Sequence, residues 1–146
     1  MGKGFLRTGR SKGGKSPLQA SASGRSAAEL YSAGLDCHRR GEKEKAKSLY
    51  KQVVALDARH ARALNLLGLI YAEDGCHADA VEVMNRARLI DPENAFALNN
   101  LGVSLRALRS TTEAVRTYDA ALALNPDIAD ALRNRGFAIW ECFIGR

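Results

Sequence analysis

Residues 64–92, LNLLGLIYAEDGCHADAVEVMNRARLIDP, carry a pattern that returns along most of the chain. The glycine of this stretch belongs to a series with a step of 34 residues, and alanine, leucine and bulky positions keep the same step. The series are Gly34, Gly68, Gly102 and Gly136; Ala27, Ala61, Ala95 and Ala129; Leu30, Leu64, Leu98 and Leu132; Ala46, Ala80 and Ala114; and Tyr50, Met84 and Tyr118. A step shared by so many positions predicts a repeat protein.

The spacing within one unit predicts two helices joined by a turn. Four residues fall at i, i+3, i+4 and i+7, which is one face of a helix: Leu64, Leu67, Gly68 and Tyr71. A turn is expected near Gly75, and Ala80, Met84 and Ala87 mark the buried face of a second helix. We expect the glycine and the alanine on facing helices to let the backbones approach closely, because a large side chain there would overpack the contact by about 1–3 kcal/mol.

A helix pair that recurs every 34 residues resembles the tetratricopeptide repeat. That family's motif, Leu-x-x-Leu-Gly-x-x-Tyr followed by Ala-x-x-x-Met-x-x-Ala and Asp-Pro, stands in residues 64–92, and the resemblance covers residues 27 to about 143. It implies an all-α fold, a right-handed superhelix (α-solenoid) of stacked helix-turn-helix units. We expect full repeats at 27–60, 61–94 and 95–128, and one extra C-terminal helix in a partial unit, 129–146.

Local signals predict where the helices begin and end. In the first unit we expect helices over 27–40 and 42–56 with Gly41 at the turn, and a solvated lysine-rich face on the second helix. Asn94 is placed to cap the helix that follows it, and Ser110-Thr111-Thr112-Glu113 has the form of a capping box. Arg109 replaces the usual turn glycine, a departure that we expect to cost little.

The last helix is more apolar than the terminal helix of a solenoid should be. Arg135 stands in a column of small and apolar residues, so we expect its charge to reach solvent. The apolar side chains are Phe137, Ile139, Trp140, Phe143 and Ile144. Three explanations stay open: a piece of a longer solenoid, an end that docks on a partner or on a second copy, or a frayed, aggregation-prone end.

The formal net charge of +6 comes from residues 1–26, which hold six basic side chains and no acidic ones, against sixteen of each sign in the rest. This segment is rich in Gly and Ser, and we predict a disordered tail. A merely solubilising extension is the favoured interpretation; a transit peptide, or contact with nucleic acid or anionic lipid, are the alternatives. Residues 9–16, GRSKGGKS, match the phosphate-loop pattern, but no core strand precedes them and no convincing helix follows, so nucleotide hydrolysis is not predicted.

Nothing else in the sequence points to catalysis, a cofactor or a metal. Cys37-His38 and Cys76-His77 occupy different repeat positions, because Cys37 is expected in a core column and Cys76 in a turn, so zinc binding is not expected. The three cysteines form no Cys-x-x-Cys pair, which favours reduced thiols in a reducing compartment. No apolar run reaches the ~18 residues of a membrane span, and Gly4-Phe5-Leu6 is too short for the core of a signal peptide. We therefore expect a non-enzymatic, cytoplasmic protein.

Stacked units of this kind curve so that their first helices line the concave side. The outward stripe of those helices combines an apolar floor with amides, and an Asn side chain can both donate to and accept from the backbone of an extended peptide. The candidate groove residues are Asn65, Leu69, Phe96, Asn99, Asn100, Val103, Arg106, Arg133, Asn134 and Phe137, with Tyr31, Ser32, Leu35, His38 and Arg39 in the first unit. The alternative is that the Asn side chains are only solvated helix residues.

Two subtypes of the family can be compared by position. Repeats that clamp the C-terminal carboxylate of heat-shock chaperones use Lys, Asn and Arg at five places. Four of these five places do not match in this sequence, which has Tyr31, Leu35, Leu66, Phe96 and Asn100 there. Repeats of O-linked N-acetylglucosamine transferase-like (SPINDLY-type) proteins place an Asn two residues before the unit's glycine, which Asn100 and Asn134 match. Their catalytic domain is absent from this sequence, so their catalysis does not carry over.

The sequence therefore predicts a non-catalytic scaffold that binds a protein or peptide segment in the groove. Two alternatives belong to other classes. One is a substrate-recruiting fragment of a larger glycosyltransferase-like protein, and the other is nucleic-acid binding by the tail, which would be sensitive to salt.

Overall fold

The computed structural model describes residues 24–145. Within that range the chain forms seven helices and no strands: α2 (Ala27–Arg39), α3 (Lys43–Leu56), α4 (Ala61–Glu73), α5 (His77–Ile90), α6 (Ala95–Ala107), α7 (Thr111–Leu124) and α8 (Ala129–Ile144). The predicted all-α repeat fold is confirmed, and the helix ends of the first unit differ from prediction by one residue. The predictions for residues 1–23, including the phosphate-loop match at 9–16, lie outside the described residues.

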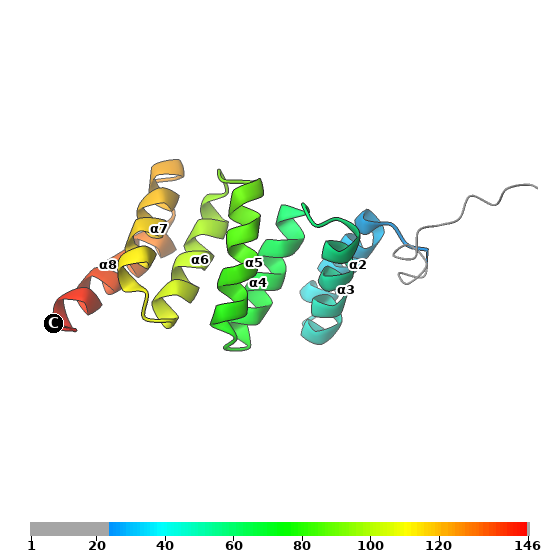
Figure 1. The fold of residues 1–146 in the computed structure, drawn as a ribbon, viewed down its shortest axis with the longest axis horizontal. Helices are drawn as coiled ribbons and strands as arrows, with labels where there is room; N and C mark the ends of the chain where they lie inside the picture. The colour runs from blue at the N-terminus through cyan, green and yellow to red at the C-terminus, as the bar shows by residue number, and fades with distance from the viewer. Residues whose placement is uncertain (1–23, 146) are drawn as a thin grey trace, which may run out of the picture.

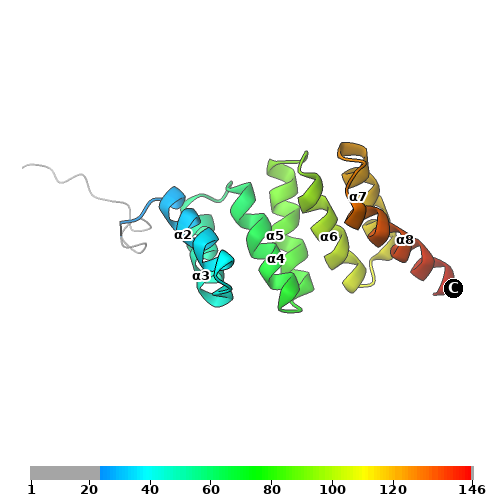
Figure 2. The same cartoon turned by 180° about the vertical axis from the view of Figure 1, so that it is seen from behind.

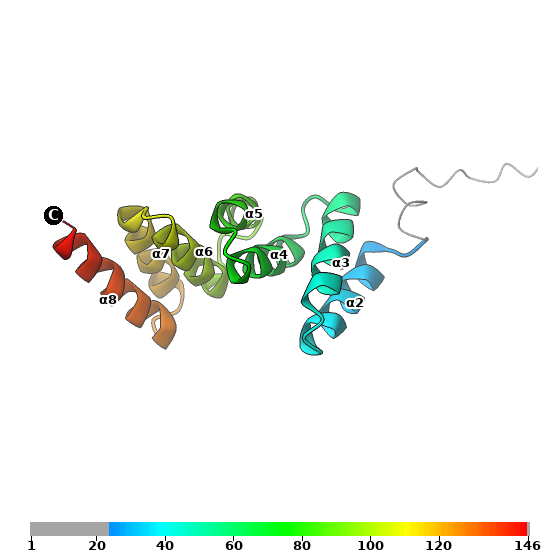
Figure 3. The ribbon, with the colours of Figure 1, turned by 90° about the horizontal axis from the view of Figure 1, so that it is seen from below.

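Three helical hairpins follow one another, α2–α3, α4–α5 and α6–α7, and α8 packs on the last of them. Each second helix also packs against the first helix of the next unit. The first helices α2, α4, α6 and α8 lie along one side of the elongated stack, and the second helices lie along the other (Figures 1 and 2). Seen from below, the hairpins succeed one another along the long axis from α2–α3 to α8 (Figure 3).

Within each hairpin a bulky side chain lies directly on the glycine of the first helix. A Cβ atom built on Gly34 would lie 2.6 Å from Cε1 of Tyr50, and one on Gly102 would lie 2.5 Å from Cε1 of Tyr118. At Gly68 the nearest atom would be Cγ of Met84, at 2.6 Å. We expected the alanine of the second helix to face this glycine, and that prediction is wrong. The residue that covers the glycine is the bulky one four positions after the alanine. The alanines themselves, such as Ala80, are fully buried in the same core.

The fourth glycine of the series is an internal control for this contact, because no atom lies within 4 Å of a Cβ built on Gly136. We expect Gly102→Ala to overpack Tyr118 at a cost of about 1–3 kcal/mol. Gly136→Ala should instead stabilise the chain by about 0.5–1 kcal/mol, since alanine is the better helix former and meets open space. Urea unfolding followed by circular dichroism measures both; equal effects of the two substitutions would contradict the packing described here.

The turns between the two helices of each unit need one residue in the left-handed backbone region. Gly41 and Gly75 supply it with φ of 75° and 80°, and Arg109 takes the same place in the third unit with φ of 65°. A side chain with a Cβ is strained in this conformation by about 1–2 kcal/mol. The arginine at this position therefore costs more stability than we expected from the sequence.

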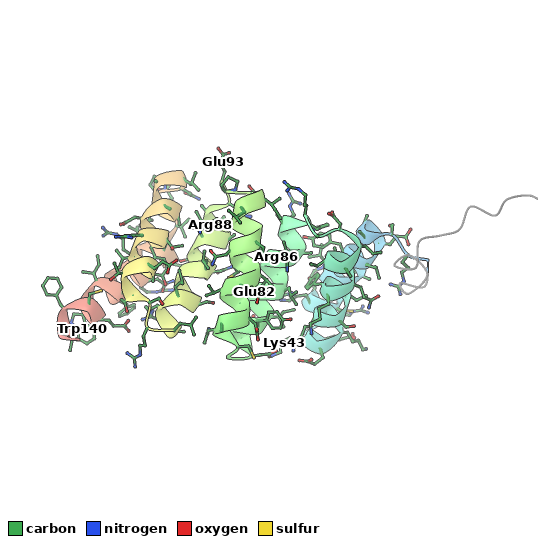
Figure 4. All side chains as sticks on the ribbon, viewed as in Figure 1. Lys43, Glu82, Arg86, Arg88, Glu93 and Trp140 are labelled. Atoms are coloured by element: carbon green, nitrogen blue, oxygen red, sulfur yellow. The ribbon has the colours of Figure 1, made fainter. Side chains whose placement is uncertain are left out.

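Arg109→Gly should raise the free energy of unfolding by about 0.5–1 kcal/mol, because the strain disappears while glycine adds some entropy to the unfolded chain. The matched control is Arg86→Gly, since Arg86 is exposed on α5, where Figure 4 shows it beside Glu82. Glycine inside a helix should lower stability by about 1 kcal/mol. Thermal melts of the two variants should move in opposite directions, and a parallel loss would refute the strain at Arg109.

Within residues 24–145, three of the first helices, α2, α4 and α6, receive side-chain caps at their N-termini, whereas α8 and the second helices do not. Asn94 Oδ1 accepts a hydrogen bond of 3.0 Å from the backbone N–H of Ala97, which confirms the predicted cap of α6. The capping box at Ser110 is wrong, since the Ser110 side chain makes no capping bond to α7. Side-chain caps need an extended N-cap backbone, and the tight turn through Arg109 leaves Ser110 with ψ of only 57°.

The lysine-rich face of α3 is not wholly solvated. Lys43 and Lys47 both bind the carboxylate of Asp74 at the end of α4, with Lys47 Nζ 2.7 Å from Asp74 Oδ2. Hydrogen bonds from Lys43 and then from Lys47 lower the pKa of Asp74. These two lysines therefore tie the first unit to the second, while Lys45 and Lys51 stay exposed as expected.

Candidate functional site

The centre of the first-helix face has an apolar floor. Leu69 on α4 and Val103 on α6 are half-buried and pack against a cluster of buried side chains that includes Met84 and Leu101. This floor is part of the solenoid core, so its shape is set by the packing of the repeats. Polar side chains of α4, α6 and α8 surround it.

Two of the predicted groove amides bond to each other. Asn134 Nδ2 on α8 donates to Asn99 Oδ1 on α6 over 3.2 Å. Asn99 is only 8% exposed, so the prediction of an open amide at this position is wrong. The Asn99 N–H groups and the Asn134 side-chain oxygen take no part in this bond. Asn134 is half-buried.

A second amide pair stands at the same repeat offset one unit earlier. Asn65 and Asn100 are 35 residues apart, as Asn99 and Asn134 are, and both are half-buried. Oδ1 of Asn65 is buried and has no hydrogen-bond partner among the described residues. A buried acceptor without a partner is unfavourable by about 1–3 kcal/mol.

The same offset joins a charged pair that the sequence analysis missed. Arg106 Nη1 lies 3.1 Å from Glu141 Oε1, which links α6 to α8 beside the amides. Tyr118 is buried nearby; burial raises its pKa to about 12, and the Arg106 guanidinium acts in the opposite direction. The phenol therefore stays neutral at physiological pH, and the Arg106–Glu141 pair balances its own charge. The offset of 35 residues was the signal in the sequence that would have found Glu141.

The other predicted site residues are not gathered at this centre. Phe96 is 66% exposed and lines a hollow of about 500 Å³ with Glu93, Leu124 and the end of the α5–α6 loop. Arg133 and Phe137 line a different hollow on α8. The predicted residues thus form one central patch and two outlying positions.

In the first unit the predicted groove residue Tyr31 is engaged in the core. Its ring centroid lies 4.6 Å from that of His60 and 6.1 Å from that of Tyr50. Leu35 and His38 are half-buried, whereas Ser32 and Arg39 are exposed. The open part of the face therefore begins at α4.

Arg135 does reach the surface from its apolar column, where it pairs with Asp119 of α7. All three cysteines are free thiols; Cys37 is buried in the core as expected, and Cys76 is exposed. Over residues 24–145, no three His, Cys, Asp or Glu side chains are grouped as metal ligands. No helix in that range is both long and apolar enough to cross a membrane.

A stack of paired helices with an amide-lined apolar face on its first helices defines a helical-repeat protein of the solenoid class. The chain belongs to the tetratricopeptide repeat family: the family model described as "Tetratricopeptide repeat" matches residues 31–95 and 97–141. A search of curated proteins found no match.

Solved structures with a similar fold include the following three. One is the first TPR of Spaghetti (RPAP3) bound to the HSP90 peptide SRMEEVD, with 20% identity, a TM-score of 0.76, and coverage of 80% of this chain and 92% of that one. The Sgt2 TPR domain from Aspergillus fumigatus has 22% identity, a TM-score of 0.72, and coverage of 80% of each chain. MamA has 22% identity, a TM-score of 0.75, and coverage of 81% of this chain and 69% of that one. At these identities the likeness is one of fold.

The contact between Asn99 and Asn134 can be measured by a double-mutant cycle. Asn99→Ala and Asn134→Ala should each lower stability, and the double variant should lose less than their sum, by about 0.5–1.5 kcal/mol for one hydrogen bond. Asn100→Ala combined with Asn134→Ala is the matched control, since no such bond joins them. Strict additivity for the first pair in urea unfolding would mean that the bond contributes nothing.

Proposed function

We propose that the chain is a non-catalytic interaction module that binds an extended segment of a partner protein across the first helices α4, α6 and α8. The segment would lie over the floor made by Leu69 and Val103. Amides on either side of this floor would take its backbone groups. Catalysis has no part in this proposal.

The observation that supports the proposal is the presence of two pairs of Asn side chains with the same spacing of 35 residues, Asn65 with Asn100 and Asn99 with Asn134. An Asn side chain offers both a donor and an acceptor, which is what the alternating N–H and C=O groups of an extended chain require. Asn65, Asn100 and Asn134 are each half-buried, so part of each side chain is open to such a chain. Asn99 serves instead to hold Asn134 in place, so the contacts with the ligand fall to Asn65, Asn100 and Asn134.

The charges of the face favour an internal segment over an acidic C-terminus. The RPAP3 domain in the similar structure holds a peptide that ends in EEVD. Here Tyr31, Leu66 and Phe96 stand where a carboxylate clamp would need polar or basic side chains, and Arg106 already pairs with Glu141. A near-neutral segment bound through its backbone and its apolar side chains fits this surface better.

Several narrower ideas accompany this proposal as predictions. The fragment of a glycosyltransferase-like protein rests on Asn100 and Asn134 and on the sequences of residues 97–102 and 118–127, and none of the similarities above favours it. A separate tail over 1–26, a repeat domain over 27–146, a cytoplasmic location and self-association through the C-terminal helix are also predictions.

A display library of random 12-residue peptides, screened on the full chain, tests the proposed function. Peptides selected in this way should bind Asn100→Ala about 5–10-fold more weakly, which corresponds to one lost hydrogen bond of about 1–1.5 kcal/mol. The matched control is Gln52→Ala, which removes an amide from α3 on the opposite side of the stack. Fluorescence anisotropy measures both affinities.

Two outcomes would reject the proposal. One is a library that yields no binder, and the other is a set of binders that respond to Gln52→Ala as strongly as to Asn100→Ala. Tight binding of the peptide SRMEEVD would instead reject the preference for internal segments.

A further inference from the structure

The ion pair between Arg106 and Glu141 shares a helix face with the amides of the patch. Arg106 follows Asn99 by two helical turns on α6, and Glu141 follows Asn134 by the same interval on α8. Each pair joins α6 to α8, with 3.1 Å between Arg106 Nη1 and Glu141 Oε1. Two turns of helix rise by about 10 Å, which about three residues of an extended segment span. A segment bound at the amides therefore has a residue close to the ion pair.

Both side chains of this ion pair are half-buried, with exposures of 30% for Arg106 and 35% for Glu141. Salt and water screen charges at this depth less than they screen exposed ones. Among residues 24–145, Glu141 is the one carboxylate within 4 Å of Arg106, and the nearby phenol of Tyr118 is neutral. The charge of Arg106 is therefore balanced by a single side chain of the last helix.

A ligand with a carboxylate near this position meets two obstacles. The guanidinium that would bind it is already occupied, and the carboxylate of Glu141 repels it as a like charge. If Glu141 were absent, Arg106 would keep its charge, because a guanidinium is not deprotonated in proteins. Its N–H groups would then be free for a charge-assisted hydrogen bond to the ligand.

The other cations of the first-helix face do not replace Arg106. Arg133 pairs with Asp130, and Arg62 is exposed at the start of α4. An ion pair at a fully exposed position contributes little, because water and salt screen it. Arg106 is thus the cation on which binding of an acidic segment to the patch depends most.

We propose that Glu141 is a specificity-determining residue, which occupies Arg106 in the way that a ligand carboxylate would and so excludes acidic segments from the patch. Removal of this one carboxylate converts the patch into a site that prefers acidic segments. The repulsive element of such a specificity is as important as the attractive contacts. This role of Glu141 rests on the function proposed above, because it concerns the same patch.

The same peptide library, screened in parallel on the unaltered full chain and on Glu141→Ala, tests this role. Peptides selected on Glu141→Ala should be enriched in Asp and Glu, and those selected on the unaltered chain should not. An enriched acidic peptide should bind Glu141→Ala at least about tenfold more tightly than the unaltered chain, since it gains a hydrogen bond between charged groups. Fluorescence anisotropy measures both affinities.

Three controls separate the role of Glu141 from a general effect of charge. Asp119→Ala removes the same charge from α7, where Asp119 pairs with Arg135, and should produce no enrichment of acidic peptides. The double variant with Glu141→Ala and Arg106→Gln should lose the gain, because the guanidinium that binds the ligand is gone. Glu141→Gln keeps the size of the side chain and should also select acidic peptides. Circular dichroism checks that each variant is folded.

The outcomes distinguish this role from the proposed function. If the unaltered chain selects peptides and Glu141→Ala selects the same ones, the function stands and the role of Glu141 is wrong. If only Glu141→Ala selects peptides and they are acidic, the role stands and the proposed function is wrong. An equal enrichment on Asp119→Ala, or a gain that survives Arg106→Gln, would also overturn the role, and a library that yields no binder to either chain overturns both.

Discussion

The structure depends on one steric constraint, the contact of a bulky side chain with the glycine of the preceding helix. Because Gly34, Gly68 and Gly102 have no Cβ, the rings of Tyr50 and Tyr118 and the thioether of Met84 can lie directly on the backbone. This contact brings the two helices of a hairpin close together, and the leucine four residues before each glycine is buried, as Leu30, Leu64 and Leu98 are. Three such hairpins follow one another, so the same contact recurs from unit to unit.

The regular stack also fixes which side chains of successive first helices can meet. Pairs 35 residues apart, one repeat plus one residue, face each other across α6 and α8, as Asn99 with Asn134 and Arg106 with Glu141 show. The patch proposed for ligand binding is thus built from contacts between repeats, and no single unit contains it. The patch is polar but not strongly charged, because Arg106 near its centre is paired with Glu141.

In the last helix, α8, the glycine of the series has no bulky side chain packed on it. Gly136 keeps the glycine of the series, but no bulky residue covers it, and the apolar side chains around it remain exposed. Helix α8 continues through Phe143, at the repeat position where the other units turn. The constraint that closes three hairpins is therefore unsatisfied at Gly136.

Much of this architecture followed from the sequence by itself, because a step of 34 residues with helical spacing inside each unit allows one kind of packing only. The units, the turns at Gly41 and Gly75, the cap at Asn94, the burial of Cys37 and the apolar end of the chain were all predicted. Only the tertiary structure decided which side chain covers each glycine, that Asn99 is buried against Asn134, and that Tyr31 turns into the core. It also decided that Ser110 cannot cap α7 and that Lys47 reaches Asp74. These depend on the distance and rotation between neighbouring helices, and periodicity along the chain specifies which face of a helix is buried without specifying what lies opposite.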